Sequence, residues 1–276
     1  MKHIGYFFRS FVPFLIAVLL QLVVSVPADF IYAALHADKE SGILDILDAA
    51  SSDPFLTQTV NLIYGILAVL VFVTWYRRVF VLPARRRRKE SGAEGGRPLG
   101  FSFHNVLALF FLAIGLQYVT TFVVDAVSRL NPVWLENYHS LMGNAGYAGT
   151  ALIPVVYSVF LAPVVEETLF RGLIFRYARC ALPFWLANIW QALLFGLLHM
   201  NVLQGVYAFT VGLVLGFICH RGRGIKYGIL LHILFNLVGV FYSGLIELTT
   251  ALSYSLFIGI GLALTVFALW LFYTDF

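Results

Sequence analysis

Charged residues are scarce in this chain, and their scarcity excludes a water-soluble domain. Only 12% of the 276 residues are Asp, Glu, Lys or Arg, whereas soluble proteins carry about a quarter. The hydrophobic share is 61% and the mean hydropathy is +0.88. The apolar residues form long uncharged runs, as a chain requires when hydrocarbon surrounds it and its backbone must satisfy its own hydrogen bonds. The sequence therefore predicts an all-α, polytopic integral membrane protein.

Features that mark several common protein classes are also missing. The two cysteines, Cys180 and Cys219, lack metal-ligand spacing and give no basis for a disulfide. We find no internal repeat, no glycine-rich phosphate loop and no HExxH sequence. ATP-driven transport and standard zincin chemistry therefore have no support in the sequence.

Eight apolar runs have about the length of a membrane helix, which needs roughly 17–25 residues to cross a bilayer. These runs are residues 11–33, 56–76, 103–127, 148–170, 183–200, 203–220, 227–245 and 252–273. The fifth and sixth are short, and only His199, Met200 and Asn201 separate them. They could therefore form a hairpin or a broken pair instead of two full crossings.

The basic residues are distributed asymmetrically around these spans. If the N-terminus is cytoplasmic, 16 of the 18 Lys and Arg residues lie on the cytoplasmic side, and Lys39 and Arg129 lie outside. Cytoplasmic loops retain positive charge during insertion, so we expect both termini to be cytoplasmic, in the bacterial inner (plasma) membrane. A signal peptide cleaved near Ala28 is an alternative that leaves the later topology unchanged.

A basic run, Arg85–Lys89, follows the second span. Such a run is typical of a topology determinant that also meets anionic lipid headgroups, so we expect the lipid bilayer and no nucleic acid as its partner. Glycines and a proline follow it and indicate flexibility. The predicted organisation is two N-terminal transmembrane helices (1–76), a flexible basic cytoplasmic linker (77–100) and a six-helix membrane core (101–276).

The fourth span carries charged residues, which cost about 2.5–3.5 kcal/mol each inside a membrane, so function is the first hypothesis for them. Glu166, Glu167 and Arg171 stand in the sequence EETLFR. On a helix Glu167 and Arg171 share a face, whereas Glu166 is rotated by about 100°. We expect Glu167 to pair with Arg171 and Glu166 to face a cavity as a general base. A purely structural ion pair is the alternative.

Two more motifs place residues four apart on one helix face. FGLLH contains Phe195 and His199, and HILFN contains His232 and Asn236. His199 could share a water with a carboxylate, and the donors of His232 and Asn236 could stabilise an oxyanion. An interfacial histidine and interhelical hydrogen bonds are the respective alternatives.

In this order on successive helices, the three motifs resemble the signature of the CAAX-protease and bacteriocin-processing family, which includes the prenyl-protein endopeptidases. The resemblance covers about residues 103–250. It implies a conical or irregular bundle of about eight helices that encloses a polar cavity. It also implies a glutamate-dependent intramembrane endopeptidase that acts on a peptide or a membrane-anchored protein.

The resemblance further implies roles for individual residues. A water would be activated by Glu166 and His199, and the oxyanion would be stabilised by His232 and Asn236. The supporting residues would be Glu167, Arg171 and Phe195. No cofactor or metal is implied. A zinc-dependent version stays open, because two histidines and one glutamate also form a reasonable zinc site.

The depth of His199 is difficult to reconcile with straight vertical helices. It lies about twenty residues beyond Arg179, nearly a full bilayer at 1.5 Å per residue, whereas Glu166 and His232 are expected near the basic flanks. Either residues 172–182 lie along the interface, or the fifth and sixth spans are tilted or broken. We predict that His199 converges on Glu166 and His232.

Two non-proteolytic functions remain as alternatives. A bacteriocin-immunity or scaffolding protein could use the same polar cavity for binding, although it would not need both water-activating and oxyanion groups. A transporter could use intramembrane Glu, His and Arg residues as a proton relay. Transporters commonly contain inverted repeats, and none is found here.

Overall fold

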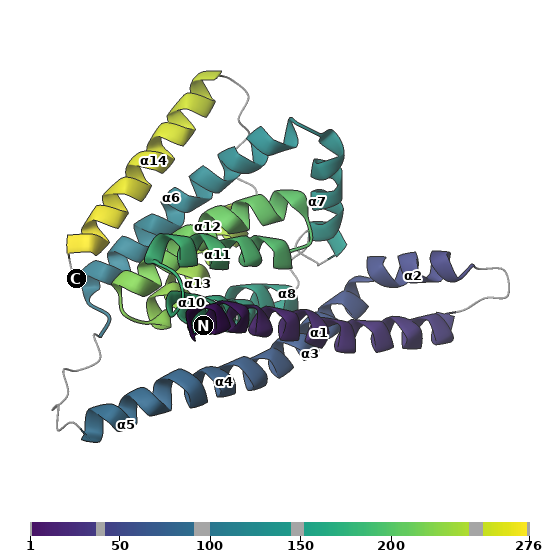
Figure 1. Ribbon diagram of the computed structural model, residues 1–276. Coiled ribbons are helices and arrows are strands. Elements are labelled where there is room, and N and C mark those ends of the chain that lie inside the picture. Colours follow the sequence, from purple (N-terminus) through teal and green to yellow (C-terminus); the bar gives the residue numbers. More distant parts are fainter. Residues whose placement is uncertain (1, 37–41, 91–99, 145–151, 243–250, 275–276) are drawn as a thin grey trace.

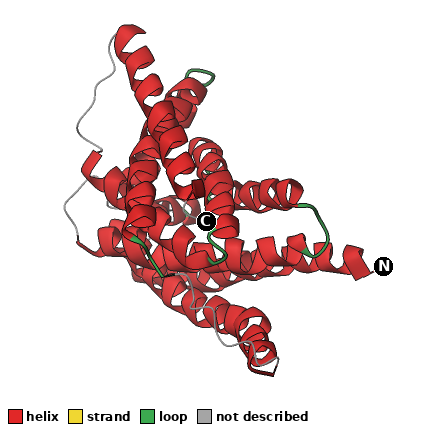
Figure 2. Ribbon diagram, turned by 90° about the vertical axis from the view of Figure 1, so that its left-hand side faces the viewer, coloured by secondary structure: helices red, strands yellow, loops and turns green. Residues whose placement is uncertain are grey.

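The computed structural model describes residues 2–36, 42–90, 100–144, 152–242 and 251–274 (Figures 1 and 2). These residues form helices and short connections, with no strand among them, so the all-α expectation is confirmed. The elements, with π-helical segments labelled η, are α1 (Lys2–His36), α2 (Ile43–Ser52), α3 (Pro54–Ala68), η1 (Val69–Val73), α4 (Thr74–Tyr76), η2 (Arg77–Val81), α5 (Leu82–Glu90), α6 (Phe103–Ser128), α7 (Pro132–Asn144), α8 (Leu152–Val156), η3 (Tyr157–Leu161), α9 (Ala162–Glu166), η4 (Glu167–Ile174), α10 (Phe175–Arg179), α11 (Phe184–Leu198), α12 (Val202–Arg221), α13 (Ile225–Tyr242) and α14 (Ala251–Thr274).

Six helices among the described residues are long and apolar enough to cross a membrane. They are Ile4–His36, Pro54–Arg87, Phe103–Ser128, Leu152–Arg179, Val202–Arg221 and Tyr254–Thr274. The shorter apolar helices Phe184–Leu198 and Ile225–Phe241 correspond to the fifth and seventh expected spans. Large apolar side chains such as Leu15, Leu19 and Phe30 are exposed on the outside, where lipid would cover them. The expectation of a polytopic membrane protein is confirmed.

Two of the expected boundaries are corrected by the structure. The helix that begins at Leu152 does not end near residue 170 but continues to Arg179. The helix of the second span continues through η2 and α5 to Glu90, so residues 77–90 of the expected linker are helical. Arginine and lysine are good helix formers, and their long side chains can reach water from a helix that passes out of the hydrocarbon. Residues 91–99 of the expected linker lie outside the described residues.

The motif-bearing helices form the centre of the bundle (Figure 1). On one side α6 contacts α12, α13 and α14, and on the other side α1 contacts α3, α10 and η4. The α1 helix is joined to α11 by a hydrogen bond from Trp190 Nε1 to Ser10 Oγ at 3.1 Å. The ring centroids of Phe11 and Trp190 are 4.4 Å apart. The first N-terminal helix therefore packs directly on the motif-bearing core.

The α11 and α12 helices approach each other closely enough to exclude side chains at their crossing. A Cβ atom added to Gly196 would lie 2.5 Å from the carbonyl oxygen of Gly205. Small residues allow membrane helices to approach backbone to backbone in this way. Met200 turns the chain between the two helices with a φ of 53°. The fifth and sixth expected spans are therefore a tight hairpin, with His199 at its turn.

Candidate active site

The continuous helix from Leu152 to Arg179 places Glu166 deep in the bundle. Glu166 precedes Arg179 by thirteen residues, or roughly 20 Å of helix. His199 follows Phe184, the first residue of α11, by fifteen residues, or roughly 22 Å. The two residues therefore lie at similar depths. The mismatch in depth was expected because the fourth span was taken to end near residue 170. The structure has no separate interfacial helix at 172–182, and α11 is too short for a straight full crossing.

A buried ion pair joins Glu167 and Arg171, as the spacing of four residues predicts. Arg171 Nη1 donates to Glu167 Oε1 at 2.7 Å, and both side chains are 0% exposed. Each charge is therefore neutralised by the other where water cannot do so. The pairing that we expected is confirmed, although it lies well inside the bundle and not at a helix end.

Polar groups on α11 and α12 extend this ion pair. Arg171 Nη2 donates to the carbonyl oxygen of Gly212 at 3.1 Å, and Gln191 Nε2 donates to the same oxygen at 2.8 Å. Asn188 Nδ2 donates to the carbonyl of Leu213 at 2.9 Å. Asn188 and Gln191 were not among the residues predicted from the sequence. The signal that could have found them is their polarity, because a polar side chain inside an apolar span is costly and suggests a role.

His232 connects the two adjacent carboxylates. Its Nδ1 lies 3.0 Å from Glu167 Oε1 and its Nε2 lies 3.6 Å from Glu166 Oε2. Glu167 Oε1 also accepts from Arg171 Nη1, so the short contact with His232 is made by an N–H at Nδ1. The contact between Nε2 and Glu166 is longer than a hydrogen bond. His232 thus lies between the two carboxylates inside the bundle.

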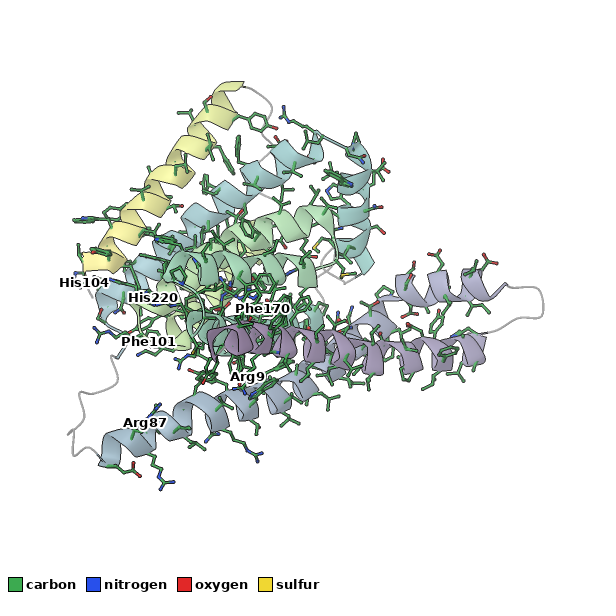
Figure 3. The ribbon with its side chains drawn as sticks, in the orientation of Figure 1. Arg9, Arg87, Phe101, His104, Phe170 and His220 are labelled. Atoms are coloured by element: carbon green, nitrogen blue, oxygen red, sulfur yellow. The ribbon has the colours of Figure 1, made fainter. Side chains whose placement is uncertain are left out.

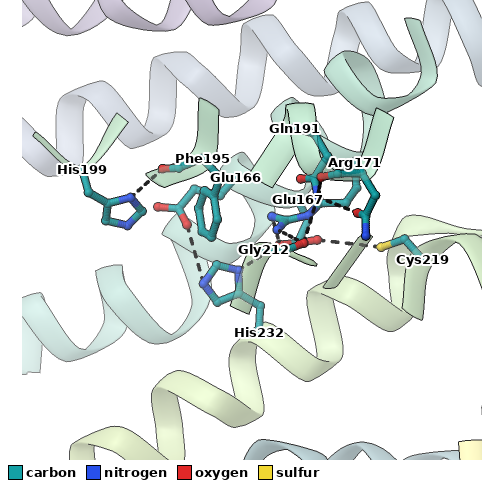
Figure 4. Close-up of polar contacts among 10 residues, drawn as sticks. Glu166, Glu167, Arg171, Gln191, Phe195, His199, Gly212, Cys219 and His232 are labelled. Carbon is teal, nitrogen blue, oxygen red and sulfur yellow. Dashed lines mark hydrogen bonds and ion pairs between the residues drawn. The ribbon is translucent and has the colours of Figure 1, made fainter. Parts of the chain in front are cut away.

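The side chain of Glu166 is the accessible member of the carboxylate pair. It is 20% exposed, whereas the Glu167 side chain is 0% exposed. Figure 4 shows its carboxylate lying between the rings of His199 and His232. Glu166 is therefore the more accessible of the two carboxylates.

His199 is fixed by the end of its own helix. Its Nδ1 lies 2.8 Å from the carbonyl oxygen of Phe195, so Nδ1 carries the proton of the neutral ring and Nε2 is an acceptor. The ring centroid of Phe195 is 5.0 Å from that of His199 and 5.9 Å from that of His232. Phe195 also lies under the guanidinium of Arg171, at 4.6 Å. The structure thus brings His199, Glu166 and His232 together, as predicted.

Asn236 lies one turn beyond His232 and is partly buried. Its Nδ2 donates to the carbonyl oxygen of Ser158 at 2.7 Å, which joins α13 to η3. This is the interhelical hydrogen bond that the sequence analysis left open as an alternative role. A primary amide carries two N–H groups, so one donor remains for a further partner.

A metal ion would need several donor side chains grouped around one point. Among the described residues, no three His, Cys, Asp or Glu side chains are grouped so that they could hold a metal ion. Glu167 is taken up by Arg171 and His232, and the Nδ1 of His199 by a backbone carbonyl. No arrangement in this part of the chain favours the zinc-dependent alternative.

The fold and the site define a helical membrane protein with a carboxylate and imidazole centre inside its bundle. Residues 148–238 match the family model described as Type II CAAX prenyl endopeptidase Rce1-like. The matched segment includes Glu166, His199, His232 and Asn236. This segment, about a third of the chain, is similar to that family, and the match supports a CAAX-type intramembrane endopeptidase in general. No curated protein and no solved structure matches the chain.

Proposed function

We propose that this protein is an intramembrane endopeptidase that hydrolyses a peptide bond inside its helix bundle, and not at the end of the span as the sequence suggested, by a metal-free, glutamate-dependent mechanism. The substrate is a peptide or a membrane-anchored protein. The observation that carries the proposal is the division between the adjacent carboxylates. Glu167 is buried and neutralised by Arg171, whereas Glu166 is partly exposed and lies between two imidazoles (Figure 4).

The proposed first step is attack by a water that Glu166 and His199 hold. The water donates one hydrogen bond to His199 Nε2, which is the acceptor because Nδ1 donates to a carbonyl. It gives its other proton to the Glu166 carboxylate as its oxygen attacks the scissile carbonyl carbon. Glu166 then delivers that proton to the leaving amine as the carbon–nitrogen bond breaks. The proton is thus returned and the carboxylate is regenerated.

The oxyanion that forms during attack requires hydrogen-bond donors. Protonated His232 supplies Nε2–H, and Asn236 supplies the amide proton that Ser158 does not take. The state with an ionised Glu166 and a protonated His232 therefore provides a base and an oxyanion donor at the same time. The nearby Glu167 stabilises the imidazolium through its contact with Nδ1.

The proposal is tested by identifying peptides that depend on Glu166. Membranes from cells that carry the native chain are compared by quantitative proteomics with membranes that carry Glu166→Ala. We expect a small set of precursors to accumulate in the variant, with the matching products absent. A second comparison uses Glu136→Ala, which removes an exposed carboxylate on α7 and should leave the precursors unchanged. Identical peptide profiles in native and Glu166→Ala membranes would favour a binding or immunity function.

A metal-free mechanism predicts that chelation leaves proteolysis intact. Purified protein is dialysed exhaustively against a chelator and assayed with a precursor identified as above. We expect full activity and no stoichiometric metal by elemental analysis, because the proposed steps use carboxylate, imidazole and amide groups. Loss of activity that zinc restores would contradict the proposal and favour the zinc-dependent version.

A further inference from the structure

A basic cavity lies next to the buried ion pair and takes no part in the proposed chemistry. Its volume is about 250 Å³. Its lining includes Arg171, Arg176, Arg179, Cys219, His220 and Arg223. Arg171 and Cys219 are buried, whereas Arg179, His220 and Arg223 are exposed. The cavity therefore extends from the surface of the bundle to the guanidinium that supports Glu167.

Three arginines of the cavity form no ion pair with a described carboxylate, unlike Arg171, which is paired with Glu167. The described residues include no Asp or Glu within 4.0 Å of the guanidinium groups of Arg176, Arg179 or Arg223. At the inner wall, Arg171 Nε is buried and has no hydrogen-bond partner. An unpaired buried donor is costly, and an anion in the cavity would both satisfy it and offset the exposed charges. The charges and the unpaired donor therefore favour an anionic ligand.

The residues around the opening of the cavity lie at the ends of membrane spans. Arg179 is the last residue of the span Leu152–Arg179, and Arg223 follows the span that ends at Arg221. His220 stacks on Phe184 with ring centroids 4.4 Å apart, and the neighbouring Trp185 is 65% exposed. Exposed tryptophan beside arginine at a helix end is typical of the headgroup level of a bilayer.

Arg176 is held in place by aromatic side chains from the second span. Its guanidinium carbon lies 5.2 Å from the ring centroid of Tyr76 and 5.5 Å from that of Phe80. Stacking covers the flat face of a guanidinium and leaves its N–H edge available for an oxyanion. This arrangement preorganises Arg176 for a phosphate that is bound at the edge of the bundle.

We propose that this cavity binds the phosphate of an anionic lipid headgroup. Arginine is well suited to phosphate, and basic pockets between membrane helices at the headgroup level bind lipid phosphates. The acyl chains of such a lipid would stay in the bilayer beside the exposed apolar faces of the spans. A free phosphate ion has the same headgroup chemistry but gains nothing from the position of the cavity at the span ends.

The test counts phosphatidylglycerol bound to the full-length protein by native mass spectrometry, from micelles that also contain phosphatidylcholine. We expect preferential binding of one phosphatidylglycerol by the native chain. Each arginine near an anionic headgroup contributes about fivefold to binding, so the variant Arg176→Gln/Arg179→Gln/Arg223→Gln should bind on the order of a hundredfold more weakly. If that variant does not fold, Arg223→Gln alone, on the exposed rim, should weaken binding about fivefold.

The matched control is Arg85→Gln/Arg86→Gln/Arg87→Gln, which removes the same charge from exposed positions on α5 (Figure 3). The control should keep the tightly bound lipid. Equal weakening by both triple variants, or equal binding of the two lipids by the native chain, would overturn the proposal. Displacement by inorganic phosphate, or by a peptide with a free carboxyl terminus, would assign the cavity to that ligand instead. The measurement of lipid binding requires no proteolysis, so its outcome does not depend on whether the proposed endopeptidase activity is correct.

Discussion

Replacing Glu166 with glutamine is expected to lower kcat by about 10²–10⁴, the range that a positioned general base supplies. The amide keeps the shape of the side chain but cannot take the proton from the attacking water. The side chain is 20% exposed and is not part of the buried Arg171 ion pair, so the fold should be retained. The measurement is the initial rate on a saturating precursor in reconstituted membranes, alongside thermal unfolding. Glu136→Gln on α7 is the matched control and should keep native activity.

The partnership between Glu166 and His199 predicts how their losses combine. If both side chains hold one water, the variant Glu166→Gln/His199→Ala should be about as slow as the slower single variant, because residues that act as a unit are not additive. Independent structural roles would instead multiply the two losses. Multiplied losses, or a Glu166→Gln variant that keeps most of its activity, would exclude the proposed water site.

The second large effect is on stability and concerns Arg171. Arg171→Met should lower the free energy of unfolding by about 3–5 kcal/mol, because it leaves the buried Glu167 without its partner. The Glu167 side chain is 0% exposed, so water cannot replace the lost partner. The measurement is the shift of the thermal or denaturant transition in mild detergent.

Two further variants separate this charge effect from a packing effect. Glu167→Gln/Arg171→Met removes both charges and should recover much of the lost stability, because replacement of a buried pair by neutral groups is often tolerated. Arg86→Met breaks the pair with Glu90, whose side chains are 82% and 60% exposed, and should have no measurable effect. A double variant no more stable than Arg171→Met would indicate that the packing of the arginine dominates.

Much of the fold was predictable because hydrocarbon imposes strong constraints on a chain. Long apolar runs gave the expected spans, and the four-residue spacing of Glu167 and Arg171 gave the ion pair that is observed. The convergence of His199 on the carboxylates was also predicted, from its motif and not from its depth. Sequence patterns therefore predicted which of these side chains lie close together better than they predicted where the helices end.

The wrong boundaries of the second and fourth spans share a physical cause. In both cases a charged residue was taken to mark the end of a membrane helix. Arg171 suggested that the fourth helix had reached the interface, but its charge is paired inside the bundle and the helix continues to Arg179. The π-helical segment η4, which begins at Glu167, has no local signal that we used. The bond from Asn236 to Ser158 depends on how α13 packs against η3. Such contacts are set by tertiary packing and cannot be derived from spacing along one helix.

The length of α11 has a consequence for the membrane itself. Its fifteen residues span roughly 22 Å, whereas the hydrocarbon core of a typical bilayer is about 30 Å thick. The α11 helix is therefore in hydrophobic mismatch with such a bilayer, whereas the twenty residues of α12 are long enough to cross it. We expect the mismatch at α11 to be relieved by locally thinner lipid or by water at the turn that holds His199. Either response would shorten the path of water to Glu166.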